Sequence, residues 1–374
     1  MTTNSNRFPF RNLLDENFFI HRFVRHEAAF LGRMQVRTFT RFAIVLLLVA
    51  GCSLLANAQS KVGTTAAPFL NIAIGARPLG MGGAYTAVSG DAASLYWNPA
   101  SLARLKQTEV VLLHTKWLAT MNFNYAGIAM PLEKGAIGFH VTMLDVGEME
   151  QTTETQQDGT GLFFSAYDVS GAIAYAYPLT DRFYFGVNGK FIYQRIWNET
   201  ASAVALDFGT LFQTPFDKLW LGMAISNFGT DMKMSGKDLY HYYDPAPNRT
   251  GNNDKVLAGI ETDEWPLPLN VRLGLAYYTK VITEQNQVTL AMDFVHPNDN
   301  TESINLGGEY EWNRQFALRA GYKALFLQDS EEGVTAGIGL KLPFAVDKTA
   351  KFDFAYENFN RLGGVMKYSL GLMF

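Results

Sequence analysis

The stretch RFYFGVNGKFIYQRIW, residues 182–197, alternates apolar and polar side chains along its length. A period of two residues predicts a β-strand with two chemically different faces. The stretch is longer than the usual strand of about five or six residues in globular proteins, and it suits a tilted strand that crosses a membrane. Its apolar face carries Phe183, Phe185, Val187, Phe191, Tyr193 and Trp197, and its polar face carries Tyr184, Asn188, Lys190 and Gln194.

The same alternation recurs through the chain after residue 106, as in ESINLGGEYEW (302–312), QFALRAGYKALF (315–326) and KFDFAYE (351–357). We therefore predict an all-β fold, a transmembrane antiparallel β-barrel of about 14 strands over residues 107–374. The number is even, as bacterial barrels require. The expected strands are 107–118, 122–131, 135–145, 165–178, 181–197, 200–213, 216–227, 268–280, 286–297, 300–313, 314–327, 331–343, 347–357 and 364–374.

The lengths of the connections agree with a barrel whose ends both face the periplasm. Connections after odd-numbered strands then face outward, and the two longest, 146–164 and 228–267, follow the third and seventh strands. The segments PLEK, PLTD and QTPFD make short inner turns, as expected of outer-membrane barrels. A soluble sandwich would not be expected to sort its loops in this way.

Composition supports a large β-structure that faces something other than water. Of the 374 residues, 14% are aromatic and only 18% are charged, and 33 are glycine. The net charge of −4 gives no indication of a nucleic-acid partner.

The N-terminal region contains a secretory signal, which we place at residues 34–58. The apolar run RFAIVLLLVAGCSLLANA (41–58) follows Arg37 and ends in small residues, so cleavage is expected before Gln59. Residues 1–33 then reflect either a start codon assigned too early or an extension without function. The segment VAGC (49–52) also fits a lipoprotein box with Cys52 as lipid acceptor, but the apolar SLL after it favours ordinary cleavage.

The last strand, KYSLGLMF (367–374), ends in an aromatic residue. Such an ending resembles the signal that the outer-membrane barrel-assembly machinery recognises. This machinery and outer-membrane lipid are therefore expected partners. The residues proposed for the signal are Tyr368, Leu370, Leu372 and Phe374, which alternate with Lys367, Ser369 and Gly371.

A glycine-rich stretch, GARPLGMGGAYTAVSGDAASLYWNPASLARL (75–105), precedes the barrel. Gly75 and Gly80 have the spacing of a phosphate-binding loop, but Met81 and Gly82 stand where Lys and Ser/Thr are required. No βαβ unit follows either, so a nucleotide site is not expected.

The longer run GTTAAPFLNIAIGARPLGMGGAYTAVSGDAASLYWNPASLA (63–103) resembles the PorV/PorQ family of outer-membrane barrels, within the FadL-like fatty-acid-transporter superfamily. ISNFGT (225–230), RAGYK (319–323) and GVTAGIGL (333–340) look like later family blocks. In FadL-like barrels the segment before the first strand folds into the lumen as a plug with an Asn-Pro-Ala motif. The resemblance thus implies a plug at residues 59–106, placed at the periplasmic entrance.

The proposed plug motif has residue types that suit close packing. The glycines let the backbone approach the barrel wall and adopt positive φ, the proline fixes a turn, and the short polar side chains can make capping bonds. A structural role is favoured over contact with a transported or docked ligand. The motif consists of Gly80, Gly82, Gly83, Asp91, Trp97, Asn98, Pro99 and Ala100.

Inward positions carry charges of both signs. Such groups can pair across strands and hold a plug in place, whereas a selective pore would more often show a ring of one sign and a lipid tunnel would be apolar. A filled and braced lumen is therefore expected. These charges are Lys190, Arg272, Asp293, Glu309, Arg319, Lys341 and Asp353.

No catalytic residue, metal site or cofactor is predicted. The six histidines lack metal-ligand spacing, there is one cysteine, and no G-x-S-x-G elbow occurs. His140 is expected to be a polar residue of the lumen. In DLYHYYDP (238–245) a divalent-ion site is an alternative, but partner contact through the outer loop is favoured. The proposed docking residues are Tyr240, Tyr242, Tyr243 and Trp265.

The resemblance implies a non-enzymatic protein of the bacterial outer membrane that takes part in type IX secretion or a related export process. Its partners would be secreted cargo proteins, docked at the outer loops, or other secretion components. The alternative is a FadL-like transporter of hydrophobic small molecules such as fatty acids. A third possibility, from another class, is an outer-membrane enzyme.

Overall fold

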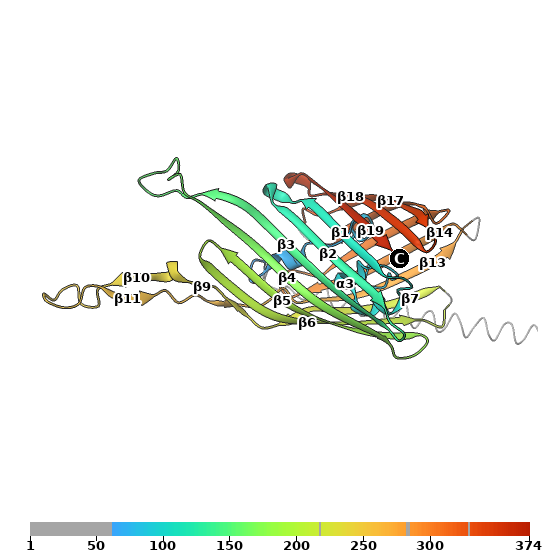
Figure 1. Ribbon diagram of the computed structural model, residues 1–374, viewed down its shortest axis with the longest axis horizontal. Helices are drawn as coiled ribbons and strands as arrows, with labels where there is room; N and C mark the ends of the chain where they lie inside the picture. The colour runs from blue at the N-terminus through green and yellow to red at the C-terminus, as the bar shows by residue number, and fades with distance from the viewer. Residues whose placement is uncertain (1–61, 217, 282–284, 328–329) are drawn as a thin grey trace, which may run out of the picture. The chain divides into compact units, whose positions relative to one another are not determined.

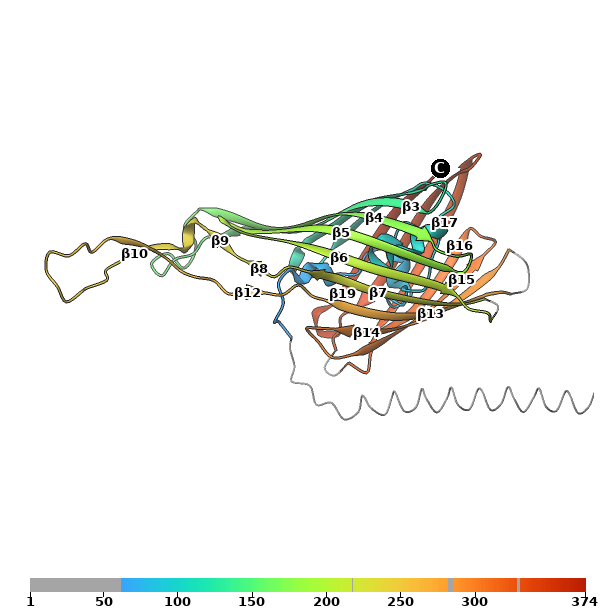
Figure 2. The same cartoon turned by 90° about the horizontal axis from the view of Figure 1, so that it is seen from below.

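The computed structural model describes residues 62–216, 218–281, 285–327 and 330–374. The predicted signal peptide, its cleavage site and Cys52 lie outside the described residues. The described chain forms a closed antiparallel barrel (Figures 1 and 2). Fourteen long strands follow one another around the wall, β1 pairs with β19, and β5 pairs with β6, so the sheet closes on itself.

Each predicted run overlaps one wall strand, which confirms the fourteen-stranded barrel. The wall strands are β1 (Glu109–Lys116), β2 (Asn122–Pro131), β3 (Ala136–Glu150), β4 (Phe163–Pro178), β5 (Phe183–Ile196), β6 (Glu199–Gln213), β7 (Leu219–Gly229), β13 (Asn270–Lys280), β14 (Gln287–Pro297), β15 (Ser303–Trp312), β16 (Phe316–Leu325), β17 (Val334–Ala345), β18 (Lys348–Asn358) and β19 (Gly364–Met373).

The alternation seen in the sequence separates the two faces of the wall. In β5, Asn188 and Lys190 are buried on the lumen side. Phe191, the residue after Lys190, is exposed on the lipid side. The outward side chains form an apolar surface for lipid, as Leu273, Leu318 and Ile338 illustrate. Closure leaves no unpaired edge within the membrane, where an unpaired backbone group would be costly.

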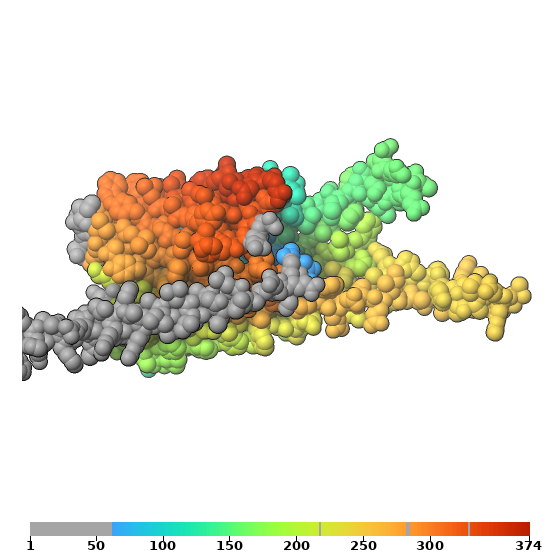
Figure 3. Space-filling model, turned by 180° about the vertical axis from the view of Figure 1, so that it is seen from behind, coloured from blue at the N-terminus to red at the C-terminus, as the bar shows by residue number. Residues whose placement is uncertain are grey.

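The long connections project from one end of the barrel, and the short turns lie at the other (Figures 1 and 3). Long loops are extracellular and short turns periplasmic in such barrels, so we name these the outer and inner ends. The predicted connection 146–164 is partly wrong, because β3 continues to Glu150 and β4 begins at Phe163. The two strands extend as a ribbon beyond the part of the wall that carries the outward apolar side chains. In this ribbon the sequence lacks the alternation that predicts a membrane strand.

The connection 228–267 has secondary structure of its own, which the sequence analysis did not predict. Strands β10 (Tyr240–Tyr243) and β11 (Val256–Gly259) form a separate hairpin. Two shorter ladders lie at its root, where β9 (Ser235–Gly236) pairs with β6 and β12 (Glu264–Trp265) pairs with β8 (Met232–Lys233). The remaining element of the connection is η4 (Lys237–Leu239).

The segment before β1 lies inside the barrel and has short helical turns (Figure 2). Its elements are η1 (Pro68–Asn71), α2 (Ala76–Gly80), α3 (Ser94–Trp97) and η2 (Pro99–Arg104). Two further short turns, η3 (Leu118–Thr120) and η5 (Asn360–Leu362), lie in outer connections. No helix among the described residues is long and apolar enough to span a bilayer.

This segment, which we call the plug (residues 62–106), runs through the lumen and is not confined to the periplasmic entrance. At the outer end the Ala66 N–H donates to the Pro266 carbonyl at 2.9 Å, and Asn71 donates to Asp299 at 3.5 Å. Near the inner end, Pro99 and Ala100 press against Gly186 of β5. The prediction that the plug lies only at the periplasmic entrance was therefore wrong. Glycines of the plug and of the wall strands let the plug backbone run close to the wall over most of its height.

Candidate functional site

A chain of five charged side chains connects the plug to the barrel wall. Arg77 of α2 binds Asp91 at 2.8 Å and Glu309 of β15 at 2.6 Å. Glu309 also accepts from Arg319 of β16 at 2.7 Å, and Arg319 binds Asp353 of β18 at 2.6 Å. Three of the predicted lumen charges thus meet in one network with Asp91 of the plug motif. The sequence analysis missed Arg77, the residue that connects the two sets.

Asp91 is fixed by more than its ion pair. The Tyr85 hydroxyl donates to it at 2.5 Å, and both groups are buried. Burial alone would raise the pKa of Asp91, but the neighbouring Arg77 and Lys351 cations hold that pKa below its ordinary value. The carboxylate therefore stays charged and joins the segment around Asp91 to Arg77 of α2.

Asp293 of β14 makes a second connection between wall and plug. Its Oδ2 accepts from the backbone N–H groups of Tyr85 and Thr86, both at 2.9 Å, and from the Thr86 hydroxyl at 2.6 Å. A carboxylate that accepts several N–H and O–H bonds is strongly held in place. Asp293, predicted as a lumen charge, thus binds plug backbone and has no ion pair among the described residues.

The predicted glycines allow the plug to touch the wall. Gly82 has φ +64°, and a methyl group added to it would lie 2.5 Å from the Leu306 carbonyl oxygen. Gly83 has φ +72° and faces the ring of Trp97, while Gly80 packs against Gly337 of β17. The wall mirrors this arrangement, because inward-facing strand glycines leave room for plug backbone. They include Gly186, Gly209, Gly222, Gly274, Gly307 and Gly321.

The Asn-Pro-Ala motif (98–100) connects the inner part of the plug to the barrel wall through the side chain of Asn98. Asn98 caps η2, since its Oδ1 accepts from the Ala100 N–H at 3.1 Å. Its Nδ2 donates to the carbonyls of Thr86 at 2.7 Å and Thr210 of β6 at 3.0 Å. One side chain thus joins two parts of the plug and one wall strand. Trp97 beside it is buried and donates to the Ile74 carbonyl at 2.8 Å.

The other predicted lumen charges form separate contacts. Lys190 binds Asp207 of β6 at 2.8 Å, and Lys341 binds Glu311 of β15 at 2.7 Å. His140 lies in the lumen, where its Nε2 is 3.3 Å from the Asn188 amide. Arg272 of β13 faces the lumen but contacts aromatic rings of the plug instead of a carboxylate.

The plug fills much of the lumen and leaves small hollows against the wall. Three of these have volumes of about 170, 30 and 10 Å³. The largest lies on the outer side of the plug, next to Arg272 and Lys323. A packed lumen with mixed charges agrees with a braced barrel more than with an open pore.

At the outer end, the hairpin β10–β11 exposes its aromatic side chains. Tyr240, Tyr242 and Tyr243 all lie on β10, and Tyr242 is 74% exposed opposite Leu257 of β11. Trp265 is exposed as well, but it lies in β12, where it pairs with Met232 of β8. The structure therefore brings the three tyrosines together and leaves Trp265 at the root of the connection.

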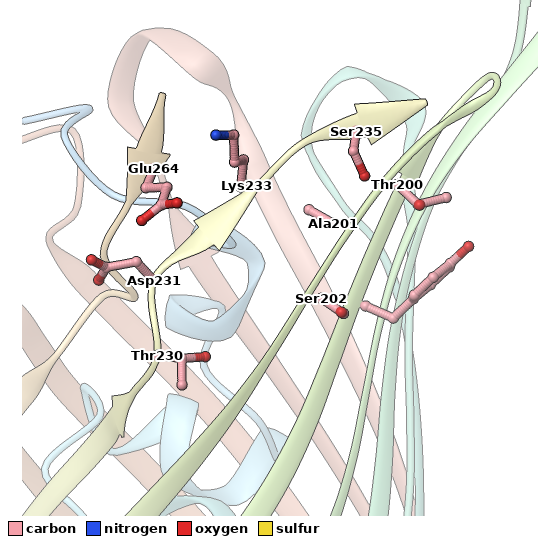
Figure 4. A pocket seen from close by; sticks show the side chains of 9 residues that line it. Thr200, Ala201, Ser202, Thr230, Asp231, Lys233, Ser235 and Glu264 are labelled. Atoms are coloured by element: carbon pink, nitrogen blue, oxygen red, sulfur yellow. The ribbon is translucent and has the colours of Figure 1, made fainter. Parts of the chain in front are cut away.

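The root of the hairpin is attached to β6 by backbone and side-chain bonds. Gly236 pairs with Glu199, and the Asp238 N–H donates to the Glu199 carboxylate at 2.9 Å. Beside this attachment the ladder is interrupted, which leaves a polar hollow of about 440 Å³ (Figure 4). The side chains of Thr200, Ser202, Thr230, Asp231, Lys233, Ser235 and Glu264 surround it.

The proposed assembly residues lie on the outer face of the last strand. Tyr368, Leu370 and Leu372 alternate with buried inward residues of β19. Phe374 follows the strand with an exposed side chain, and its N–H donates to the Thr108 carbonyl at 2.9 Å, next to the start of β1. The chain end is thus placed at the seam where the barrel closes.

Within the residues that the structure describes, no group of three or more His, Cys, Asp or Glu side chains is placed to hold a metal ion. In the outer connection, Asp244 instead accepts from the Ala246 N–H and from Asn252.

Comparison with known proteins gives one family and one fold. Residues 55–239 match the family model of type IX secretion system protein PorV. No curated protein sequence matches the chain.

Solved structures that resemble the barrel include two toluene transporters and a monoaromatic hydrocarbon channel. The Pseudomonas putida toluene transporter TodX is 13% identical with a TM-score of 0.50, over 80% of this chain and 97% of that chain. The Ralstonia pickettii toluene transporter TbuX is 12% identical with a TM-score of 0.50, over 81% and 98%. The monoaromatic hydrocarbon channel CymD is 13% identical with a TM-score of 0.50, over 81% and 97%. At this identity the likeness shows a shared fold.

Proposed function

Because the chain belongs to the PorV family of type IX secretion system proteins, we propose that it docks secreted proteins at its outer end, through the hairpin β10–β11. The barrel lies in the bacterial outer membrane, and the hairpin extends from the end with the long connections. A cargo protein that emerges at the cell surface would meet this ribbon before any other part of the connection 230–269.

The observation that carries the proposal is the exposure of the hairpin on both faces. An isolated two-stranded ribbon is only marginally stable in water, and each of its strands has a free edge. Tyr242 and Leu257 face the same side, and both are largely exposed. Tyrosines give large amphipathic contact area, and free edges can accept a further strand, so the ribbon suits a protein partner.

The root of the hairpin supports the same role. The ladders of β9 with β6 and of β12 with β8 attach the ribbon to the wall at two places. A bound partner would therefore stay near the barrel and would not swing on a long tether. The plug fills much of the lumen below it, which suits docking at the surface.

The test is capture of secreted proteins by the intact barrel, purified from outer membranes. The double variant Tyr242→Ser, Leu257→Ser removes the apolar contact of the hairpin. The variant Phe163→Ser, on the exposed end of the β3–β4 ribbon, is the matched control. We expect the first to lose most of the co-purified secreted protein and the control to retain it.

Equal capture by both variants would contradict docking at the hairpin. Equal loss would also contradict it, because capture would then depend on exposed apolar side chains in general and not on those of the hairpin. Each result requires normal amounts of folded barrel, measured by heat-modifiable migration in electrophoresis.

The transporter of hydrophobic small molecules remains the second candidate, because the barrel shares its fold with hydrocarbon transporters. The small volumes of the hollows around the plug, about 170 and 30 Å³, do not favour it. Uptake of toluene by cells that express the barrel, measured against cells that lack it, tests this candidate directly.

A further inference from the structure

The polar hollow at the root of the hairpin, with a volume of about 440 Å³, results from an interruption in one β-ladder (Figure 4). At its inner side the Thr230 N–H donates to the Val204 carbonyl at 3.0 Å, and at its outer side Ser235 pairs with Thr200. Between these two attachments β6 has three residues and the connection has four, and β8 pairs with β12 instead of β6. The connection therefore bows away from the wall and leaves the hollow between them.

The hollow lies where the lipid-facing part of the wall ends. Along β6 the outward side chains change from Leu206 and Val204, which are apolar and exposed, to the polar Ser202 and Thr200. The polar pair lies nearer the outer end, because β6 runs from the outer to the inner end of the barrel. The apolar band of a membrane barrel ends at the head groups of the lipids. The hollow is therefore level with the outer head groups, and it opens on the outside of the wall.

The lining offers many groups that can form hydrogen bonds. The hydroxyls of Thr200, Ser202 and Ser235 can both donate and accept, whereas the carboxylates of Asp231 and Glu264 only accept. None of these five side chains forms a hydrogen bond or ion pair with another described residue. They surround the hollow from two sides, β6 and the connection, as Figure 4 shows. A ligand can therefore replace the water on several of them at once.

The charges of the lining exclude one class of ligand. Two carboxylates, Asp231 and Glu264, face one cation, Lys233. The Lys233 amine also binds Glu261 at 3.2 Å, a residue outside the lining. A phosphate or a carboxylate is disfavoured in such a site. A neutral ligand with several O–H groups is favoured, because each group can donate to a carboxylate and accept from a hydroxyl.

Tyr193 of β5 adds an aromatic surface to this polar lining. It pairs in register with Ser202, and its half-buried ring lies 6.2 Å from the ring of Tyr167, measured between centres. The face of an aromatic ring carries the negative part of its quadrupole and so attracts C–H groups. A sugar ring has C–H groups on its faces and O–H groups around its rim. The lining thus matches both parts of a sugar.

We propose that this hollow binds a neutral sugar residue, carried by the glycolipids of the outer leaflet. The volume lies within the range of about 300–1,000 Å³ that is usual for ligand pockets. The level of the hollow at the head groups places it beside the sugars of such lipids. No lining residue belongs to the hairpin β10–β11, so the site does not depend on docking there.

The test uses the purified full-length barrel in a detergent without sugar head groups. The main probe is the lipid-free O-polysaccharide released from the lipopolysaccharide of the same cells, and dextran is the comparison probe. We expect the O-polysaccharide to bind, measured by calorimetry. The same polysaccharide after O-methylation should not bind, because its O–H donors have been replaced by ethers.

Glu264→Gln should weaken binding by about tenfold, because a hydrogen bond to a charged acceptor becomes one to a neutral acceptor. Asp263→Asn is the matched control. It removes one carboxylate from the neighbouring exposed residue, which is not part of the lining, so binding should be unchanged. Ser202→Tyr should abolish binding, because the larger side chain fills the hollow from β6. Heat-modifiable migration in electrophoresis verifies that each variant is folded.

The two polysaccharides distinguish the source of the sugar. Binding of the O-polysaccharide without dextran supports a glycolipid of the outer membrane, and binding of both supports a site for neutral sugars in general. Binding of neither would overturn the proposal. Unchanged binding in Glu264→Gln, an equal loss in Asp263→Asn, equal binding of the O-methylated polysaccharide, or stronger competition by glucose 6-phosphate than by glucose would each overturn it as well.

Discussion

Arg77, in the plug, donates to Glu309, in strand β15, at 2.6 Å, although the two residues are 232 positions apart in sequence. Glu309 binds Arg319 as well, so one buried carboxylate lies between two guanidiniums. Asp91 and Asp353, at the two ends of the network, complete an alternating row of charges. The plug is therefore joined to the wall by a network whose central member belongs to the barrel.

The first prediction concerns this central carboxylate. Glu309→Gln keeps the volume but leaves two buried cations beside each other without the charge between them. Breaking a buried ion pair costs about 3–5 kcal/mol, so the free energy of unfolding should fall by about that amount. The measurement is denaturant unfolding of the purified barrel, together with trypsin cleavage at plug residues, which should become faster.

The control for this variant is Glu261→Gln. Glu261 pairs with Lys233 at 3.2 Å on the exposed outer connection. A surface pair of this kind contributes about 1 kcal/mol or less. Similar losses of stability in both variants would contradict a special role for the lumen network.

The second prediction concerns the close contact at Gly82. In Gly82→Ala the added methyl group would lie 2.5 Å from the Leu306 carbonyl oxygen and 2.8 Å from the Tyr322 nitrogen. We expect the plug to be displaced, with protease sensitivity of the plug as the measurement. Gly90→Ala is the control, because Gly90 also has positive φ, at +101°, but no atom within 4 Å of the added methyl group.

In the control, the free energy of unfolding should fall only by the cost of placing alanine at positive φ, about 1–3 kcal/mol, and the plug should stay protected from the protease. If both variants protect the plug equally, close approach to β15 and β16 is not what requires glycine at position 82.

Much of the barrel could be predicted because lipid requires an apolar outer face. This requirement produces the period-two pattern in strands such as β5 and β17, and it also places charges such as Lys190 and Arg319 on the opposite face. Where the chain leaves the membrane the requirement ends. The outer part of β3 and the whole of β10–β11 therefore lack a clear alternation of apolar and polar side chains. The aromatic run YHYY (240–243) still predicts a contact surface in the outer loop.

The contacts of the plug were less predictable, for a different reason. Glycine and the Asn-Pro-Ala motif are visible locally, because they are required by local backbone geometry and capping. The partners of Arg77 and Thr86 depend on which wall strand faces each turn of the plug, and that arrangement exists only after the barrel closes. No spacing in the sequence indicates it.

The third prediction concerns assembly at the seam. Deleting Phe374 removes its exposed ring and the backbone bond to Thr108. We expect little heat-modifiable barrel in the outer membrane and accumulation or degradation of the chain in the periplasm. Phe374→Tyr keeps an aromatic end and should assemble normally. Normal amounts of inserted barrel after the deletion would count against an assembly signal at this residue.

The most direct test of the proposed function removes the hairpin alone. The Ile260 N–H donates to the Leu239 carbonyl at 2.8 Å, so a four-residue Gly-Ser link can replace residues 240–259 without moving β8, β9 or β12. The measurement is the amount of secreted cargo at the cell surface, in cells with normal amounts of folded barrel. Docking at the hairpin predicts loss of surface cargo with unchanged toluene uptake. Normal surface cargo, particularly with reduced uptake, would contradict it.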